Sequence, residues 1–274
     1  MNTQELLAEI KQSKKYKTLS EEVINEEIQK YLKRNPHYER YKDKKILKDI
    51  KTELHKIYGS FQTSSKGKRE KYFEEFKLNQ DSLELTKKIL LTNSSTKERL
   101  EDYEEIYEKI FKITGKPSSI LDLGCGLNPI SFPFMNLEKV NYYAYDIDNA
   151  DISLLNEYFY TMKEKICGKA ETINLSTIEE NEIKKLPKAD ICFMFKLVDV
   201  LDRRDHKQSE KIISNLNSKW IVVSFSKRTL AGKMMNFPYR GWIERMLERV
   251  GFEFKILDFE NEVFYVARKY KVKV

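Results

Sequence analysis

Two glycines, Gly124 and Gly126, stand one residue apart at the end of the apolar run in SILDLGCGLNPISF, residues 119–132. A short apolar run of this kind is typical of a buried strand, and the glycines let the chain turn tightly after it. A turn without side chains also allows a ligand to lie against bare backbone. Asn128 and Pro129 suit the cap and first turn of a following helix, whose amino end would face that ligand. The segment predicts a nucleotide-like ligand, although a tight structural turn would use the same residues.

A carboxylate stands where the ribose of a nucleoside would need one. Asp146, in the segment YDID, lies at the end of the next expected strand, twenty residues past Gly126. A carboxylate at that place accepts hydrogen bonds from both ribose hydroxyls. The alternative is that Asp146 and Asp148 only cap the next helix. The third glycine of the dinucleotide fingerprint is missing, which argues against NAD or FAD.

The cysteines and histidines do not suggest a metal site. Cys125, Cys167 and Cys192 are far apart, no C-x-x-C pair exists, and the three histidines are isolated. We therefore expect no zinc site and no disulfide framework, and we place all three cysteines in the core. No apolar run approaches the roughly 20 residues of a membrane span. The amino-terminal segment is too polar for a secretory signal, so a soluble intracellular protein is expected.

The net charge of +7 is unevenly distributed along the chain. Residues 1–100 carry all of the excess of Lys and Arg over Asp and Glu, and the remainder is close to neutral. Such segregation indicates an anionic partner for the amino-terminal part. The alternative is that the Lys-rich and Ile-rich composition reflects the genome or a hot habitat. That alternative explains the abundance of Lys together with Glu, but it does not explain the segregation.

The elements that would position these residues change character halfway along the chain. Up to residue 115, apolar side chains recur three and four apart, as in amphipathic helices, and Leu47, Ile50 and Leu54 show the pattern clearly. Polar breaks separate the helices, so a small bundle is expected, with residues 62–68 as a mobile loop.

One more helix is expected over residues 94–111, where Ser95 and Glu98 have capping-box spacing. Beyond it, short β-branched or aromatic runs alternate with helical segments, which is typical of a parallel sheet with crossover helices. The last two runs flank Glu260 and Asn261 and indicate a hairpin. The expected strands are residues 119–124, 141–148, 170–175, 189–196 and 219–226, followed by the two arms of 252–270.

Six segments, in order along most of the chain, resemble one family. They are SKKYKTLSEEV, SSTKERL, SILDLGCGLNP, YAYDID, FMFKLVDVLDRRD and IVVSFSKRTLAGK. The family is that of the aminoglycoside-resistance 16S ribosomal RNA (guanine-N7) methyltransferases of the ArmA/Rmt type. The resemblance implies the α/β fold of a class I S-adenosylmethionine-dependent methyltransferase, with a Rossmann-like, mostly parallel sheet that ends in an antiparallel hairpin, preceded by an all-helical domain. It divides the chain into a helical RNA-binding domain over residues 1–94, a linking helix and turn over 95–117, and a methyltransferase domain over 118–274.

The resemblance also implies an activity. It is the transfer of a methyl group from S-adenosylmethionine to N7 of a decoding-site guanine in the 16S ribosomal RNA of the 30S subunit, with aminoglycoside resistance as a consequence. Such an enzyme is expected to be cytoplasmic and monomeric and to need neither a metal nor a membrane. Two other readings stay open: methylation of another RNA position, such as N1 of adenine, and a non-catalytic RNA-binding protein that kept the fold.

Carried over position by position, the resemblance implies a set of cofactor-binding residues. Arg99 would hold the methionine carboxylate, and Asp146 would hold the ribose. The full set is Arg99, Asp122, Gly124, Gly126, Asp146, Ile147, Asn174 and Leu175. The chain departs from the family at Asn174, where an acidic residue is usual, and at Leu197 and Val198, where Leu-Pro is usual.

The resemblance further implies residues that face the RNA. Lys196 and Arg228 would position the target nucleotide, with no general base, because N7 of guanine has an exposed lone pair. Phosphate contacts are expected from Lys227, Arg228, Lys233 and Arg240, which lie in a run, 226–240, that contains no acidic residue. Phe195, Tyr239 and Trp242 are candidates for stacking on the target base.

Overall fold

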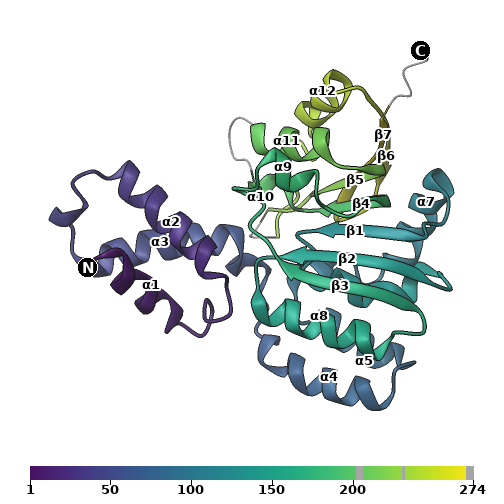
Figure 1. The fold of residues 1–274 in the computed structure, drawn as a ribbon, viewed down its shortest axis with the longest axis horizontal. Coiled ribbons are helices and arrows are strands. Elements are labelled where there is room, and N and C mark those ends of the chain that lie inside the picture. Colours follow the sequence, from purple (N-terminus) through teal and green to yellow (C-terminus); the bar gives the residue numbers. More distant parts are fainter. Residues whose placement is uncertain (202–205, 230–231, 270–274) are drawn as a thin grey trace.

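The computed structural model of the chain describes residues 1–201, 206–229 and 232–269. Within these residues, seven strands form one sheet in the order β3-β2-β1-β4-β5-β7-β6 (Figure 1). Strands β1 to β5 run parallel, whereas β7 pairs antiparallel with both β5 and β6. The strands are β1 (Ser119–Leu123), β2 (Val140–Asp146), β3 (Ile166–Thr172), β4 (Ala189–Phe195), β5 (Ser218–Ser226), β6 (Phe252–Asp258) and β7 (Glu262–Lys269). The predicted α/β class with a carboxyl-terminal antiparallel hairpin is confirmed.

The strand order reverses between β1 and β4, since β2 and β3 extend the sheet on one side and β5 extends it on the other. Ligands of open parallel sheets bind outside the carboxyl ends of the strands at such a switch point. The glycine turn after β1 and Lys196 after β4 therefore stand on the two sides of this point.

Helices cover both faces of the sheet, each over its own apolar core. On one face, α7 (Tyr103–Thr114), the 3-10 helix η4 (Asn128–Met135) and α8 (Asn149–Thr161) pack on strand residues such as Ile120 and Phe193. On the other face, α9 (Glu180–Ile183), α11 (Lys207–Asn215) and α12 (Gly241–Arg249) pack on alternate residues such as Leu121 and Cys192. Successive strand side chains point to opposite faces, so both faces of these apolar strands are buried.

The amino-terminal helices α1 (Thr3–Lys11), α2 (Glu21–Arg34) and α3 (Asp43–Ile57) form a separate unit beside the sheet, which we call the helical unit (Figure 1). Its core is built from the apolar faces of these helices, including Ile24 and Ile50, as their periodicity predicts. Ile147, from the segment after β2, also packs against this core. The backbone N–H of Ser20 donates to the carbonyl of Ile147 at 2.9 Å, so the helical unit is bonded directly to the sheet edge.

Helices α4 (Arg69–Leu78) and α5 (Leu83–Leu90) share the core of the sheet rather than that of the helical unit. Phe73, Phe76 and Leu90 are buried in the same cluster as α8 and the strands. Part of the segment expected as a helical domain over residues 1–94 therefore packs with the sheet, and the separate apolar core ends at Tyr58.

Two expected elements differ in the structure. The helix expected over 94–111 is two helices, α6 (Ser94–Arg99) and α7, and Asn93 caps α6 in place of the predicted Ser95. The segment 62–68, expected as a mobile loop, contains the 3-10 helix η3 (Lys66–Lys68), and Lys66 Nζ donates to Asp148 at 2.8 Å.

Three smaller expectations are also wrong. Cys167 is exposed on β3, although Cys125 and Cys192 are buried as predicted. Strand β3 begins at Ile166, four residues before its expected start. Asn128 does not cap the next helix, because its side chain bonds to Asp122 instead.

Parts of two motifs, residues 202–205 and 230–231, lie outside the described residues. Among the described helices, none has the length and apolar character needed to cross a bilayer.

Gly168 shows how closely α8 packs on β3. A Cβ atom added to Gly168 would lie 2.3 Å from Cγ of the buried Phe159 ring. We expect Gly168→Ala to lower the free energy of unfolding by about 1–3 kcal/mol, because the ring cannot move without disturbing the core. The control Gly67→Ala places its Cβ in open space and should change stability by less than about 1 kcal/mol. Urea unfolding followed by circular dichroism measures both variants, and equal midpoints would contradict this packing.

Candidate active site

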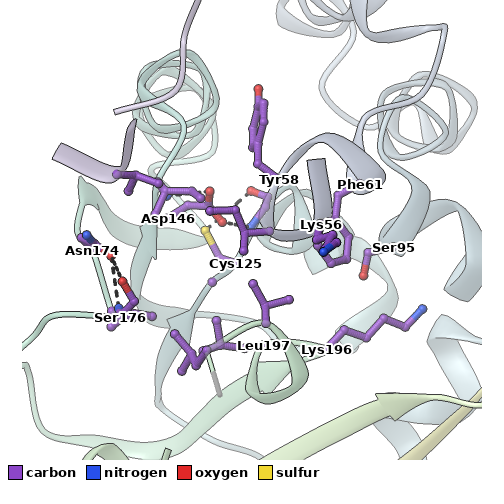
Figure 2. Close-up of a pocket in the computed structure, with 18 of the residues that line it drawn as sticks. Lys56, Tyr58, Phe61, Ser95, Cys125, Asp146, Asn174, Ser176, Lys196 and Leu197 are labelled. Atoms are coloured by element: carbon purple, nitrogen blue, oxygen red, sulfur yellow. Dashed lines mark hydrogen bonds between the residues drawn. The ribbon is translucent and has the colours of Figure 1, made fainter. Parts of the chain in front are cut away.

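A cavity of about 780 Å³ lies along the carboxyl edge of the sheet, and we call it the edge cavity (Figure 2). Its floor is formed by the segments that follow the strands, residues 124–126, 146–147, 173–176 and 195–197. Its opposite wall is formed by α2, α3 and the 3-10 helix η2 (Gly59–Phe61). In Figure 2, Asn174 and Ser176 lie at one end of the cavity and Lys196 at the other. A cavity of this size can hold a nucleoside-sized ligand.

The glycine turn and Asp146 are bonded to each other in the floor of the edge cavity. Gly124 and Gly126 both have positive φ, +65° and +50°, which explains the need for glycine. Asp146 accepts hydrogen bonds from the backbone N–H groups of Gly126 at 2.8 Å and Ile147 at 2.7 Å. Burial raises the pKa of Asp146, although these two hydrogen bonds oppose the shift. Backbone donors thus hold the carboxylate at the edge of the cavity.

Asp148, two residues further on, has a structural role. It caps α8 by accepting from the N–H groups of Ala150 and Asp151. Its other oxygen accepts from Thr18, Tyr58 and Lys66, with the Thr18 hydroxyl at 2.8 Å. The alternative reading of the YDID segment as a helix cap therefore holds for Asp148 but not for Asp146. Asp148 also joins the helical unit to the floor of the edge cavity.

Arg99 lines the edge cavity but is 97% covered, with its guanidinium surrounded by partners. Its Nε donates to Glu262 at 3.0 Å, and one terminal nitrogen donates to Asn128 at 3.1 Å and Tyr103 at 3.3 Å. The other terminal nitrogen donates to Ser95. Arg99 therefore enters the site already paired.

Asp122 lies beneath the edge cavity and is not among the residues that line it. One of its oxygens accepts from Asn128 at 2.9 Å and from Tyr142 at 2.6 Å. Burial raises the pKa of Asp122 to about 6. Its contacts support Asn128, and through Asn128 they support Arg99.

Lys196 lies at the end of the edge cavity opposite Asn174. It has φ of +54°, which is unusual for a residue other than glycine, and its backbone N–H donates to the carbonyl of Ser224 at 3.1 Å. Its ammonium group contacts Glu98 and lies 3.3 Å from Glu262. Glu262 is thereby shared between Lys196 and Arg99.

Asn174 and Leu175 follow β3 and line the edge cavity, as does Ile147. Asn174 is buried, and its amide donates to Glu26 of α2 at 2.6 Å. The structure thus gathers seven of the eight implied cofactor residues, all except Asp122, around one cavity.

The four implied phosphate-contact residues lie outside the edge cavity, in the segment that follows β5 from the same edge of the sheet. Three of them are already paired with acidic residues that are distant in sequence. These pairs are Lys227 with Asp258 at 2.9 Å, Arg228 with Glu260 at 2.9 Å and Arg240 with Asp199 at 3.2 Å. Lys233 is exposed and forms no ion pair within the described part of the chain. The run 226–240 itself contains no acidic residue, but the hairpin of β6 and β7 and the short α10 (Val198–Leu201) bring acidic residues next to it.

The candidate aromatic platforms differ in how far they are exposed. Phe195 is buried and stacks on Phe193 with ring centroids 4.7 Å apart, although it also lines the edge cavity. Trp242 stacks on His206 at 3.6 Å. Tyr239 is exposed, and its hydroxyl donates to Asp258 at 3.1 Å.

The opposite wall of the edge cavity was missed by reasoning from the sequence. It includes Glu26, Lys30, Lys56, Tyr58 and Phe61. Glu26 and Lys30 are four residues apart, a spacing that is usually an ion pair on a solvated helix face. The pattern therefore gave no sign that this face meets the sheet.

Comparisons with known proteins agree with this architecture. The family model described as "Ribosomal RNA methyltransferase (FmrO)" matches residues 12–266. A 16S rRNA (guanine(1405)-N(7))-methyltransferase of Proteus mirabilis is 29% identical and covers 97% of each chain. One from Serratia marcescens is 25% identical, covering 98% of this chain and 99% of its own.

Solved structures show the same fold. The 16S rRNA methyltransferase RmtF, in complex with S-adenosyl-L-homocysteine, superposes with a TM-score of 0.80 at 22% identity, covering 98% of this chain and 100% of its own. The 16S rRNA methylase ArmA is 28% identical, with a TM-score of 0.56, over 74% of this chain and 98% of its own. Since the family model spans nearly the whole chain and the strand edge carries the expected cavity, the chain belongs to the ribosomal RNA methyltransferase (FmrO) family.

Proposed function

We propose that the protein transfers the methyl group of S-adenosylmethionine to N7 of a guanine in the 16S ribosomal RNA of the 30S subunit. The observation that supports this most is a single cavity that joins the glycine turn and Asp146 to Lys196 across the switch point of the sheet. The relatives from Proteus mirabilis and Serratia marcescens carry the same activity in their names.

The residues of the edge cavity fit the cofactor. Asp146 offers a carboxylate to ribose hydroxyls, and the turn at Gly124 and Gly126 offers bare backbone. Gly124 has φ of +65°, which disfavours a residue with a side chain, and a Cβ there would lie 2.7 Å from Cδ1 of Leu197. Arg99 would face the methionine carboxylate. When bound, the cofactor supplies an electrophilic methyl group on a sulfonium centre.

The reaction requires the two reactants to be aligned, but it requires no proton transfer. N7 of guanine attacks with its own lone pair, so neither a base nor a metal is required. The contribution of the chain is to hold base and methyl group in line at near-attack distance. We assign Lys196 to positioning the target, since it directly follows β4 beside the switch point. Glu98 and Glu262 offset its charge, so a base that becomes cationic on methylation is not repelled.

The RNA would lie across the exposed basic side of this edge. Lys227, Arg228, Lys233 and Arg240 are proposed to meet phosphates, and the basic excess of residues 1–100 favours RNA contact by the helical unit as well. Three of these cations must exchange a carboxylate for a phosphate on binding. We propose that the protein acts as a monomer on 30S subunits, and therefore in the cytoplasm.

The test is to treat 30S subunits with the protein and S-adenosylmethionine and to map the modified base. Borohydride and aniline cleave RNA at 7-methylguanine, so primer extension should stop at one guanine in a cofactor-dependent way. A stop that appears without the chemical step would indicate methylation of a Watson–Crick edge, such as N1 of adenine. No modification, with cofactor bound, would indicate a non-catalytic RNA-binding protein.

The cofactor assignment predicts the behaviour of Asp146. Asp146→Ala should weaken S-adenosylhomocysteine binding at least tenfold in isothermal titration, because hydrogen bonds to a charged acceptor contribute about 1.5–3 kcal/mol each. Gly126→Val should abolish binding, since its φ of +50° disfavours a branched residue. The control is Asp190→Ala, which removes a carboxylate that also accepts backbone N–H groups, from Ser118 and Ser119, at the opposite edge of the sheet. Equal affinity of Asp146→Ala and the parent would refute the assignment.

The ion pairs of the basic residues predict that one substitution tightens binding to 30S subunits. Glu260→Gln should remove the ion pair of Arg228 and tighten binding to 30S subunits a few-fold at low salt, as expected for an exposed ion pair worth about 0.2–1 kcal/mol. Lys233→Ala should instead flatten the plot of log affinity against log salt by about 0.7–0.9. Filter binding at several salt concentrations measures both.

The control for Glu260→Gln is Glu164→Gln, which makes the same change in net charge at an exposed site beyond the far end of α8. If both glutamine variants tighten binding equally, net charge alone is responsible and the loop has no special role. Unchanged affinity and slope in Glu260→Gln and Lys233→Ala would place the RNA elsewhere.

A further inference from the structure

Glu26 is a carboxylate of the helical unit that is turned toward the sheet. It belongs to α2, lines the edge cavity, and its side chain is only 15% exposed. One of its oxygens accepts from Asn174 and from the Ser176 hydroxyl, each at 2.6 Å. Lys30 contacts its other oxygen at 2.5 Å. A largely covered carboxylate that contacts residues of another unit needs an explanation beyond helix stability.

The orientation of the Asn174 amide follows from its neighbours. Its oxygen accepts from the backbone N–H of Ser176 at 3.1 Å, so its nitrogen must be the atom that faces Glu26. Burial opposes the charge of Glu26, but the hydrogen bonds from Lys30, Ser176 and Asn174 outweigh it and hold the pKa of Glu26 below its ordinary value. Glu26 is therefore an acceptor only, while Asn174 keeps a second N–H to donate.

The order of the strands decides which part of a nucleoside cofactor would reach this pair. Along the carboxyl edge, the segments follow in the order β3, β2, β1, β4. Asp146, after β2, would hold the ribose, and Lys196, after β4, lies on the side of the target. The base must then extend the other way, toward the end of β3, where Leu175 and Ile147 offer apolar sides and Asn174 and Glu26 offer polar groups. In Figure 2, Asn174 and Ser176 occupy that end, away from Lys196.

We propose that Glu26 and Asn174 together read the amino edge of the adenine ring, with Glu26 accepting from the exocyclic amine and Asn174 donating to N1. This inference rests on the proposed function and adds to it a specificity-determining residue from the helical unit. The donor and acceptor pattern of the pair matches adenine. A 6-oxo purine presents the reverse pattern, an acceptor at C6 and a donor at N1. Its C6 oxygen would face the carboxylate of Glu26, and its N1–H would face the N–H of Asn174, so neither hydrogen bond could form.

The experiment compares two ligands that differ only at this edge, S-adenosylhomocysteine and S-inosylhomocysteine, by isothermal titration to the full-length protein. The parent should prefer the adenosyl ligand at least about tenfold, as hydrogen bonds to a charged group imply. In Glu26→Gln the preference should shrink about tenfold, because an amide can turn to suit either edge. A merely structural role for Glu26 would weaken both ligands equally and leave their ratio unchanged.

The control is Glu22→Gln, one turn earlier on α2. Glu22 contacts Thr177 at 3.4 Å but does not line the edge cavity, so its substitution should leave both affinities at parental values. A parent that binds both ligands equally, or a Glu26→Gln variant with the parental ratio, would overturn the inference while leaving the proposed function intact. A parent that binds neither ligand would overturn both.

Discussion

The burial of Arg99 is the constraint around which the site is arranged. A guanidinium cannot lose a hydrogen and presents five donors, so at this depth it needs a partner in nearly every direction. Glu262 from β7, Asn128 from η4 and Tyr103 from α7 supply those partners. Removing one partner of such a buried pair costs about 3–5 kcal/mol, because the remaining charge is left uncompensated. Arg99 thereby connects α7 and η4, near the start of the methyltransferase fold, to β7 at its end.

The same constraint extends to the target side. Glu262 is almost fully covered and is shared by Arg99 and Lys196, and both cations lower its pKa against the effect of burial. The carboxylate therefore fixes the distance between the residue assigned to the cofactor and the residue assigned to the target base. Contacts within the chain alone therefore hold these two side chains near each other.

Much of the fold could be predicted because its causes are local. The runs that became β1, β4 and β5 are apolar on both faces, and the hairpin around Asn261 lies where the turn residues place it. The break between α6 and α7 could not be predicted, because residues 100–102 fit a helix and carry no local signal for a turn. Nor could the contact between Lys66 and Asp148 be predicted, because the two residues are far apart in the sequence.

The site was predictable to the extent that parallel strands bring their carboxyl ends together. Gly126, Asp146, Asn174 and Lys196 share one edge for that reason. The wall from α2 and α3 was not predictable, since an amphipathic pattern identifies the apolar face of a helix but not which charged residues meet another unit. The acids that pair with Lys227 and Arg228 were hidden for a similar reason, since they lie about thirty residues away in the chain.

The seam between Leu19 and Asp148 has a consequence for engineering. Leu19 pairs antiparallel with Asp148, and the backbone N–H of Asn149 donates to the carbonyl of Thr18 at 3.0 Å. The helical unit is therefore joined to the rest of the enzyme by main-chain bonds at the loop that carries Asp146, not only by side chains. A chimera that exchanged this unit between relatives would have to graft the seam, residues 18–20 together with 146–149, as one piece. Exchange of this unit between relatives therefore depends on the backbone register of the seam.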